Sequence, residues 1–203
     1  MTHRLHRGDL PEGIDFGASV AIDTEAMGLN PHRDRLCLAQ LSGGDGDAHL
    51  VQFAPGCYEA PNLKRLLADP GVVKLFHFAR FDIAILYHYL GVMPQPLYCT
   101  KIASRLARTF SDRHGLRDLC KDLLGVDLKK EQQSSDWGAR NLTEEQLRYA
   151  ASDVLHLHAL RARLDEMLAR ERRIEMARSC FDFLPARALL DLAGWAEQDI
   201  FAH

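Results

Sequence analysis

The order of β-prone and helical patterns along the chain constrains its fold more than any other sequence feature. Three short β-prone runs come first, at 19–22, 36–41 and 49–53, and polar or glycine-rich segments separate them. Helical and β-type patterns then alternate, with a helix at 60–67, a strand at 72–76, a helix at 79–90 and a short apolar run at 96–99. An opening meander followed by this mixture predicts an α/β fold, in which helices flank a central mixed β-sheet.

The second half of the chain is predicted to be helical. Helical spacing at 102–108 and 116–124 precedes a polar stretch at 129–141. Thr143 then stands before two glutamates, as an N-cap residue does, and the apolar spacing continues to about Leu168. This pattern predicts the longest helix of the protein.

The chain is long enough for one substantial core, since 47% of its 203 residues are hydrophobic. We expect one domain over residues 1–168 and a C-terminal helical extension over 169–203. The extension contains Leu189, Leu192 and Trp195. These side chains predict packing against the domain or contact with a second copy of the chain.

Composition limits where the protein is expected in the cell and which substrates it is expected to bind. The chain has no uninterrupted apolar run of about 18 residues and no signal-peptide core near its start, so we expect a cytoplasmic protein without membrane contact. Its five cysteines are scattered and form no CxxC pair, which predicts free thiols. The net charge of −3 argues against holding long duplexes by general electrostatics, but a short substrate that is gripped locally remains compatible.

Acidic residues follow the first apolar run and recur on two predicted helices. Asp23 and Glu25 lie two residues apart after Val20-Ala21-Ile22, so an extended backbone points both carboxylates to one side. Asp82 lies near the start of the helix at 79–90, and Tyr149 and Asp153 share a helix face because they are four residues apart. Carboxylate oxygens are the ligands that hard divalent cations prefer.

Each of these residues also has an ordinary structural explanation. A single acid at a strand end or on a helix is more often a solvated charge, and Tyr149 alone would read as an amphipathic core residue. His77 is a core histidine or a phosphate contact, and Trp137 reads as core rather than as a base-stacking platform. The loop Gly43–Gly46 lacks the lysine and serine of a P-loop, so we interpret it as a hairpin turn.

Three segments together resemble the DEDD superfamily of exonucleases, in its tyrosine-bearing, ribonuclease D-like branch. They are Val20–Glu25, His77–Asp82 and Tyr149–Asp153. The stretches Cys99–Leu106, His114–Leu116 and Ser135–Trp137 resemble ribonuclease D relatives as well, so the resemblance covers about residues 19–164. One departure is Phe78, which stands where the superfamily commonly has Asn.

The resemblance implies a ribonuclease H-like fold and a 3′-5′ exonuclease activity. Asp23, Glu25, Asp82 and Asp153 would bind two divalent cations, Mg²⁺ or Mn²⁺, which support the attack of water on the last phosphodiester. Tyr149 would orient that water. The products would be nucleoside 5′-monophosphates.

The opening Gly8–Pro11 and the segment Asp23–Leu29 look most like the nano-RNase C subfamily, short ribonuclease D-like enzymes of alphaproteobacteria. That likeness implies short single-stranded RNA, down to dinucleotides, as substrate, and a homo-oligomer, an octamer, as assembly. The residues expected to contact substrate are Thr24, Leu29, His77, Arg80, Arg113 and Ser135.

Several alternatives stay open at this level. Leu29 is either a wedge between two terminal bases or a core residue. The cations Lys101, Arg105, Arg108, Arg113 and Arg117 line a phosphate path or form a solvated face. The competing functions are ribonuclease D-like trimming of structured RNA, a 3′-5′ exonuclease acting on DNA, and an inactive nucleic-acid-binding protein on the same fold.

Overall fold

The protein is built around a six-stranded mixed sheet, and the computed structural model describes residues 2–128 and 135–202. The strands are β1 (Thr2–Arg7), β2 (Ser19–Ala26), β3 (Leu36–Ser42), β4 (Asp47–Gln52), β5 (Val73–Phe76) and β6 (Leu97–Cys99). Their order across the sheet is β1-β4-β3-β2-β5-β6. β2, β3 and β4 form the predicted antiparallel meander, and β5 and β6 extend it in parallel from β2.

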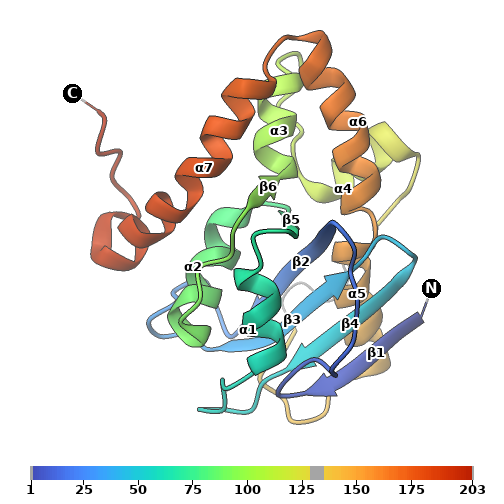
Figure 1. The fold of residues 1–203 in the computed structure, drawn as a ribbon, viewed down its shortest axis with the longest axis vertical. Coiled ribbons are helices and arrows are strands. Elements are labelled where there is room, and N and C mark those ends of the chain that lie inside the picture. Colours follow the sequence, from blue (N-terminus) through green and yellow to red (C-terminus); the bar gives the residue numbers. More distant parts are fainter. Residues whose placement is uncertain (1, 129–134, 203) are drawn as a thin grey trace.

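Helices cover both faces of the sheet. They are α1 (Pro61–Ala68), α2 (Ala79–Leu90), α3 (Thr100–Ala107), α4 (Leu116–Leu119), α5 (Glu144–Leu155), α6 (Leu157–Arg170) and α7 (Ile174–Leu190). α1 lies in front of the sheet and α5 behind it in Figure 1, and α5 contacts β1, β2, β3 and β4. The predicted α/β fold with a mixed sheet and C-terminal helices is therefore confirmed.

The central strand β3 shows why the sheet is stable. All of its residues, Leu36–Ser42, are buried because helices pack on both of its faces. A strand covered on both sides reads as a nearly continuous apolar run instead of an alternating one. The run from Leu36 to Leu41 is of this kind, and it places the neighbouring strand β2 firmly in the centre of the molecule.

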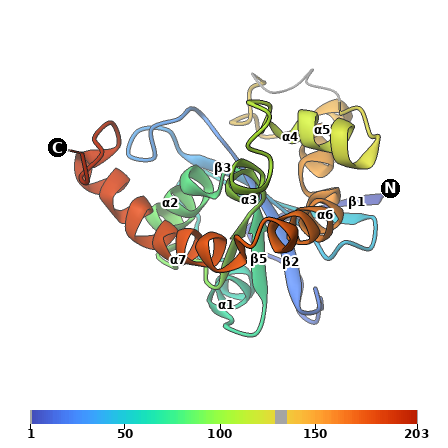
Figure 2. The ribbon, with the colours of Figure 1, turned by 90° about the horizontal axis from the view of Figure 1, so that it is seen from above.

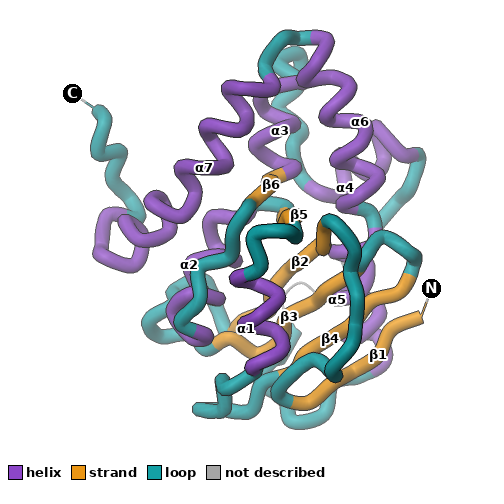
Figure 3. The backbone as a smooth tube through the Cα atoms, viewed as in Figure 1, coloured by secondary structure: helices purple, strands orange, loops and turns teal. Residues whose placement is uncertain are grey.

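The helices that follow the sheet form a second layer at one end of it. α6 packs against α3, and α7 runs back along α3, β6 and α2, as the view from above shows (Figure 2). The tube drawing shows this end as mostly helical, while most of the strands lie at the other end together with α1, α2 and α5 (Figure 3). None of the described helices is both long and apolar enough to span a membrane.

The first strand was missed by the sequence interpretation. β1 pairs in parallel with β4 along residues Thr2–Arg7, yet Leu5 is its only aliphatic residue. An edge strand has one unpaired side and buries little, so its residues need not alternate in polarity. Backbone pairing with β4, and not an apolar pattern, fixes this strand.

The predicted long helix from Thr143 to Leu168 is wrong in one respect: it is two helices. The backbone at His156 (φ −105°, ψ −5°) ends α5 and begins α6. The apolar spacing runs through the break because α5 buries a face against the sheet and α6 buries one against α3. As a result α7, with 17 residues, is the longest helix that the structure describes.

The helix predicted at 116–124 also differs in detail. It begins as the single turn α4 and continues as a π-helical turn, Cys120–Leu124, which Gly125 ends with a positive φ. The polar stretch predicted at 129–141 lies partly outside the described residues.

Candidate active site

Strand β2 delivers two carboxylates to one face of the sheet. Asp23 and Glu25 are separated by one residue, so the alternation of the strand points both toward the face that α5 covers. Asp153 of α5 lies opposite them on this face. Ligand atoms of these three residues all lie within 4.8 Å of one another.

The position of Asp153 depends on how α5 begins. Thr143 accepts a hydrogen bond from the backbone N–H of Gln146 (3.2 Å), and the Gln146 side chain accepts one from the Thr143 N–H (2.8 Å). This capping box satisfies two donors that a helix otherwise leaves unpaired at its start. Gln146 also donates to Ser135 Oγ (2.7 Å), which attaches α5 to the segment before it.

The fourth acid reaches the site from the other face of the sheet. Thr24 lies between Asp23 and Glu25, so its side chain points away from them. On that side the Thr24 hydroxyl donates to Asp82 Oδ1 (2.7 Å), at the first turn of α2, and both side chains are buried. Asp82 lies outside the compact group of three, but its charge interacts with those of Asp23 and Glu25.

Burial raises the pKa of every acid in this group, and repulsion from neighbouring carboxylates raises the pKa values of Glu25, Asp82 and Asp153 further. The pKa of Asp23 rises to about 7 through burial, and that of Glu25 rises to about 10 through burial and the charges of Asp23, Asp153 and Asp82. Burial and the charge of Asp23 also raise the pKa values of Asp82 and Asp153 well above their usual range. Such a cluster favours any partner that brings positive charge.

Tyr149 lies one helical turn before Asp153 and close to the cluster. Its pKa is raised by burial and by the charges of Asp153, Glu25 and Asp23, so the phenol stays protonated at neutral pH. The ring packs near Trp137, with centroids 6.1 Å apart, and Trp137 is 97% buried. Trp137 is thus largely a packing residue, as the sequence indicated, although it also lines the cleft described next.

The acids open into a cleft of about 1030 Å³. Asp23, Glu25 and Asp82 line it together with the loop of residues 27–35, which we call the Leu29 loop, the beginning of α2, and residues near the C-terminus. Leu29 itself is 85% exposed, so the interpretation of Leu29 as a core residue is wrong. An exposed leucine beside partly buried acids presents an apolar surface to whatever enters the cleft.

Short contacts hold the Leu29 loop in place. Asp34 accepts a hydrogen bond from the Asn30 N–H (3.0 Å) and is paired with Arg33. Arg33 and this backbone N–H lower the pKa of Asp34 to about 2, so it stays ionised. A Cβ on Gly28 would lie 2.3 Å from an oxygen of Asp34, and only glycine allows the carboxylate to sit there.

His77 and Phe78 line the cleft at the junction of β5 and α2. The Thr100 hydroxyl donates to the Phe76 carbonyl (3.2 Å), so the His77 Nδ1–H donates to Thr100 Oγ1 (2.8 Å) and Nε2 is left as an acceptor. Burial and Lys101 lower the pKa of His77 to about 3, which keeps the ring neutral. A charged phosphate contact by His77 therefore has no support in this geometry.

Phe78 was noted in the sequence only as a departure from the family pattern. Its backbone is left-handed (φ 71°), the ring is 48% exposed, and Lys101 Nζ lies 4.1 Å from the ring centroid. A bulky residue with positive φ is held there by its surroundings at a cost of order 1–3 kcal/mol. Periodicity carries no signal for such a backbone, so sequence reasoning could not assign Phe78 to the cleft.

The remaining predicted substrate contacts divide into two groups. Ser135 and Arg80 line the cleft, although Arg80 is already bound to Asp191 through Nε (2.5 Å) and Nη2 (2.7 Å). Arg113, in the loop before α4, is not brought to the cleft, because it pairs with Asp118 of α4 (2.8 Å).

The broader basic path is also largely neutralised. Arg108 and Arg117 pair with acids of their own region, Asp122 and Asp127. Arg113 and Arg117 therefore form a solvated, ion-paired face, whereas Arg108 is buried and Lys101 lies against the Phe78 ring.

Comparison with known proteins agrees with the site. The model of a family described as 3′-5′ exonuclease matches residues 10–169. Ribonuclease D of Gluconacetobacter diazotrophicus is 41% identical over 160 residues, which are 79% of this chain and 40% of that protein. The chain belongs to the 3′-5′ exonuclease family, and it spans well under half the length of this ribonuclease D.

Within the family, solved structures of a shorter protein match the whole chain. NrnC of Brucella melitensis with bound Mg²⁺ is 56% identical, with a TM-score of 0.96 and full coverage of both chains. NrnC bound to pGG is 57% identical, with a TM-score of 0.97, over 100% of this chain and 99% of that one. The predicted resemblance to the nano-RNase C subfamily is confirmed.

Proposed function

We propose that the chain is a 3′-5′ exoribonuclease that hydrolyses short single-stranded oligoribonucleotides, down to dinucleotides, to nucleoside 5′-monophosphates. The observation that carries this proposal is the convergence of Asp23, Glu25 and Asp153 within 4.8 Å, beside a cleft that exposes Leu29. Its volume of about 1030 Å³ is close to the upper end of about 300–1,000 Å³ found for sites that enclose small ligands. Similarity to NrnC bound to pGG supports the short substrate.

The acidic cluster fits divalent cations. All of its donors are carboxylate oxygens, and the raised pKa values of Asp23 and Glu25 favour a partner that brings positive charge to the cluster. We infer that Asp23, Glu25, Asp82 and Asp153 hold two such ions, Mg²⁺ or Mn²⁺, and the bound Mg²⁺ of Brucella NrnC supports this. When bound, the ions supply a lower pKa for water and positive charge near the departing oxygen.

The protein's own groups have distinct parts in the reaction. The Thr24 hydroxyl fixes the rotamer of Asp82 by donating to it. Tyr149 keeps its proton, so it acts as a hydrogen-bonding group that positions the attacking water and not as a general base. Neutral His77, with Nδ1–H committed to Thr100, offers Nε2 as an acceptor for a ribose hydroxyl.

Leu29 would contact the two terminal bases as an apolar wedge. Every base has an apolar face, so this contact is the same for all sequences. Ser135 and Arg80, which line the same cleft, are the candidates for polar contacts to the substrate. Arg113 is no longer a candidate, because it lies elsewhere.

Assembly and domain limits belong to the same proposal. We infer a homo-oligomer, an octamer by resemblance, formed through exposed apolar side chains such as Leu189 and Trp195, which are 46% and 44% exposed. Leu192 packs against the core and does not contribute to the oligomer contact.

We place the exonuclease domain at 1–168 and the extension at 169–203. Five free cysteines suit a reducing compartment, in keeping with a cytoplasmic location.

A length series of end-labelled RNAs tests the proposal. We expect kcat/KM in Mg²⁺ or Mn²⁺ to be highest for dinucleotides and to fall for longer strands. Efficiency that climbs with length, or equal cleavage of structured RNA, would favour ribonuclease D-like trimming, which the similarity to ribonuclease D makes the second candidate. The same series made of DNA decides whether DNA is also a substrate.

A further inference from the structure

The segment that follows α7 forms part of the cleft. Asp191, Gly194, Ala196 and Glu197 line it together with the acids of β2. We call residues 191–197 the C-terminal turn; it begins as a π-helical turn, Asp191–Trp195, and bends at Gly194, where φ is 100°. The turn lies beyond residues 10–169, so it is not part of the exonuclease fold shared across the family.

Asp191 attaches the turn to the start of α2. Its carboxylate accepts from Arg80 Nε (2.5 Å) and Nη2 (2.7 Å), and from Arg187 Nε (2.9 Å). Arg80 and Arg187 also donate to the carbonyls of Ala196 and Trp195 within the turn. The side chain of Asp191 is only 14% exposed between these two guanidinium groups, so this is a largely desolvated network.

A second contact attaches the turn to the Leu29 loop. His32 Nε2 lies 2.8 Å from the carbonyl of Leu192, and since a carbonyl only accepts, the histidine donates. The ring of His32 also packs edge-on against His88 of α2, with centroids 4.9 Å apart. The turn, the Leu29 loop and the start of α2 are thereby fixed relative to one another.

We propose that the C-terminal turn is a wall of the substrate cleft that selects against long strands, with Asp191 as its positioning residue and Glu197 as its repelling charge. This inference rests on the proposed function. An RNA strand whose 3′ end lies at the acids of β2 must leave the cleft past the remaining walls, which include the C-terminal turn. Glu197 is exposed at the wall of the cleft. The negative charges of Glu197 and Asp191 both offset the positive charge of Arg80, so Arg80 offers little net attraction to the phosphates of a longer strand.

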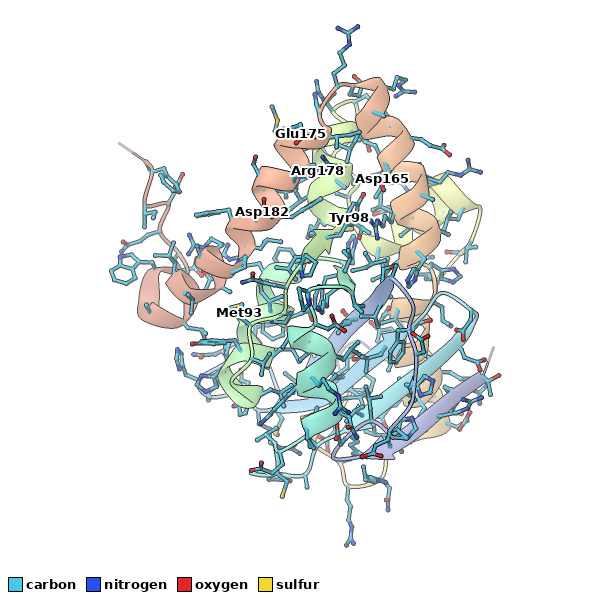
Figure 4. All side chains as sticks on the ribbon, in the orientation of Figure 1. Met93, Tyr98, Asp165, Glu175, Arg178 and Asp182 are labelled. Carbon is cyan, nitrogen blue, oxygen red and sulfur yellow. The ribbon has the colours of Figure 1, made fainter. Side chains whose placement is uncertain are left out.

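Two variants test the wall by different routes. Asp191→Ala removes the acceptor that holds Arg80 and Arg187, and a change in tryptophan fluorescence that disappears when Trp195→Phe is added reports whether the turn moves. Glu197→Arg reverses an exposed charge and does not require the turn to move. Asp191→Glu keeps the carboxylate, and Glu175→Gln, in the exposed Glu175–Arg178 pair at the far end of α7, is the matched control (Figure 4).

The readout is the ratio of kcat/KM for a strand of about ten nucleotides to kcat/KM for a dinucleotide. In Glu197→Arg we expect this ratio to rise about threefold at physiological salt and about tenfold at low salt. It should also rise in Asp191→Ala, and it should stay at the wild-type value in Asp191→Glu and Glu175→Gln.

The outcomes separate this inference from the proposed function. A wild-type preference for dinucleotides that both Asp191→Ala and Glu197→Arg retain overturns the wall alone. Equal loss of activity at every length in Asp191→Ala, with no change of ratio in Glu197→Arg, gives the turn a purely structural role and also overturns it. A wild-type enzyme with no length preference overturns both the wall and the proposed preference for short RNA.

Discussion

Replacing Asp23 by Asn should stabilise the cation-free protein while it abolishes activity. Asn has nearly the same shape as Asp but no charge, so Asp23→Asn removes one of the repelling carboxylates of the partly buried cluster. The folded protein raises the pKa of Asp23 from 3.8 to about 7. Folding is therefore penalised wherever the unfolded chain has already released this proton.

The sign and size of the effect follow from linkage. Above about pH 4 the folded state retains a proton that the unfolded state has lost, so stability falls as pH rises toward 7 and the loss is complete above it. Each pKa unit corresponds to about 1.4 kcal/mol, which gives at most about 4 kcal/mol near pH 8. Because Asp23 is partly exposed, we expect about 2 kcal/mol after solvent screening.

The assay is thermal unfolding in a chelator, followed by circular dichroism at two pH values. Near pH 8 the melting temperature of Asp23→Asn should exceed that of the wild type by about 4–8 °C, and near pH 4 the two should agree. Added Mn²⁺ should stabilise the wild type more than the variant, because the variant has lost a ligand. A variant less stable than wild type in chelator near pH 8 would refute the reasoning, and normal hydrolysis by it would refute the role of Asp23.

Three further predictions concern the walls of the site. Tyr149→Phe should lower kcat about tenfold to hundredfold with little change in KM, because the hydroxyl positions the attacking water and does not bind the substrate. Unchanged single-turnover rates would show that Tyr149 only packs against Trp137. Leu29→Ala should raise KM for dinucleotides about tenfold, since it deletes apolar contact from a side chain that is 85% exposed without substrate, and the melting temperature should not change. Equal KM values for Leu29→Ala and wild type would exclude the wedge. Gly28→Ala should destabilise the Leu29 loop by about 1–3 kcal/mol and raise KM as well, because the new methyl group meets Asp34. A thermal melt measures the loss of stability, and a dinucleotide titration measures KM. Wild-type values in both assays would show that the loop adapts to the methyl group.

The sequence by itself determined the features that depend on local periodicity. The strand period of two placed Asp23 and Glu25 on one side of β2, and the helical period placed Tyr149 and Asp153 on one face of α5. The meander and the α/β order followed from apolar runs in the same way. Family resemblance added Asp82, whose position near the start of α2 has no signal in periodicity alone.

Tertiary structure alone decided which distant residues meet. β1 is held by pairing with β4, and His156 divides one apolar pattern into two helices that bury their faces against different partners. Sequence spacing could not show that Arg80 binds Asp191, 111 residues away, or that Arg113 turns to Asp118 instead of the cleft. Side-chain charge specifies what a residue can bind, but the choice among several possible partners depends on which of them the packed backbone brings within hydrogen-bonding distance.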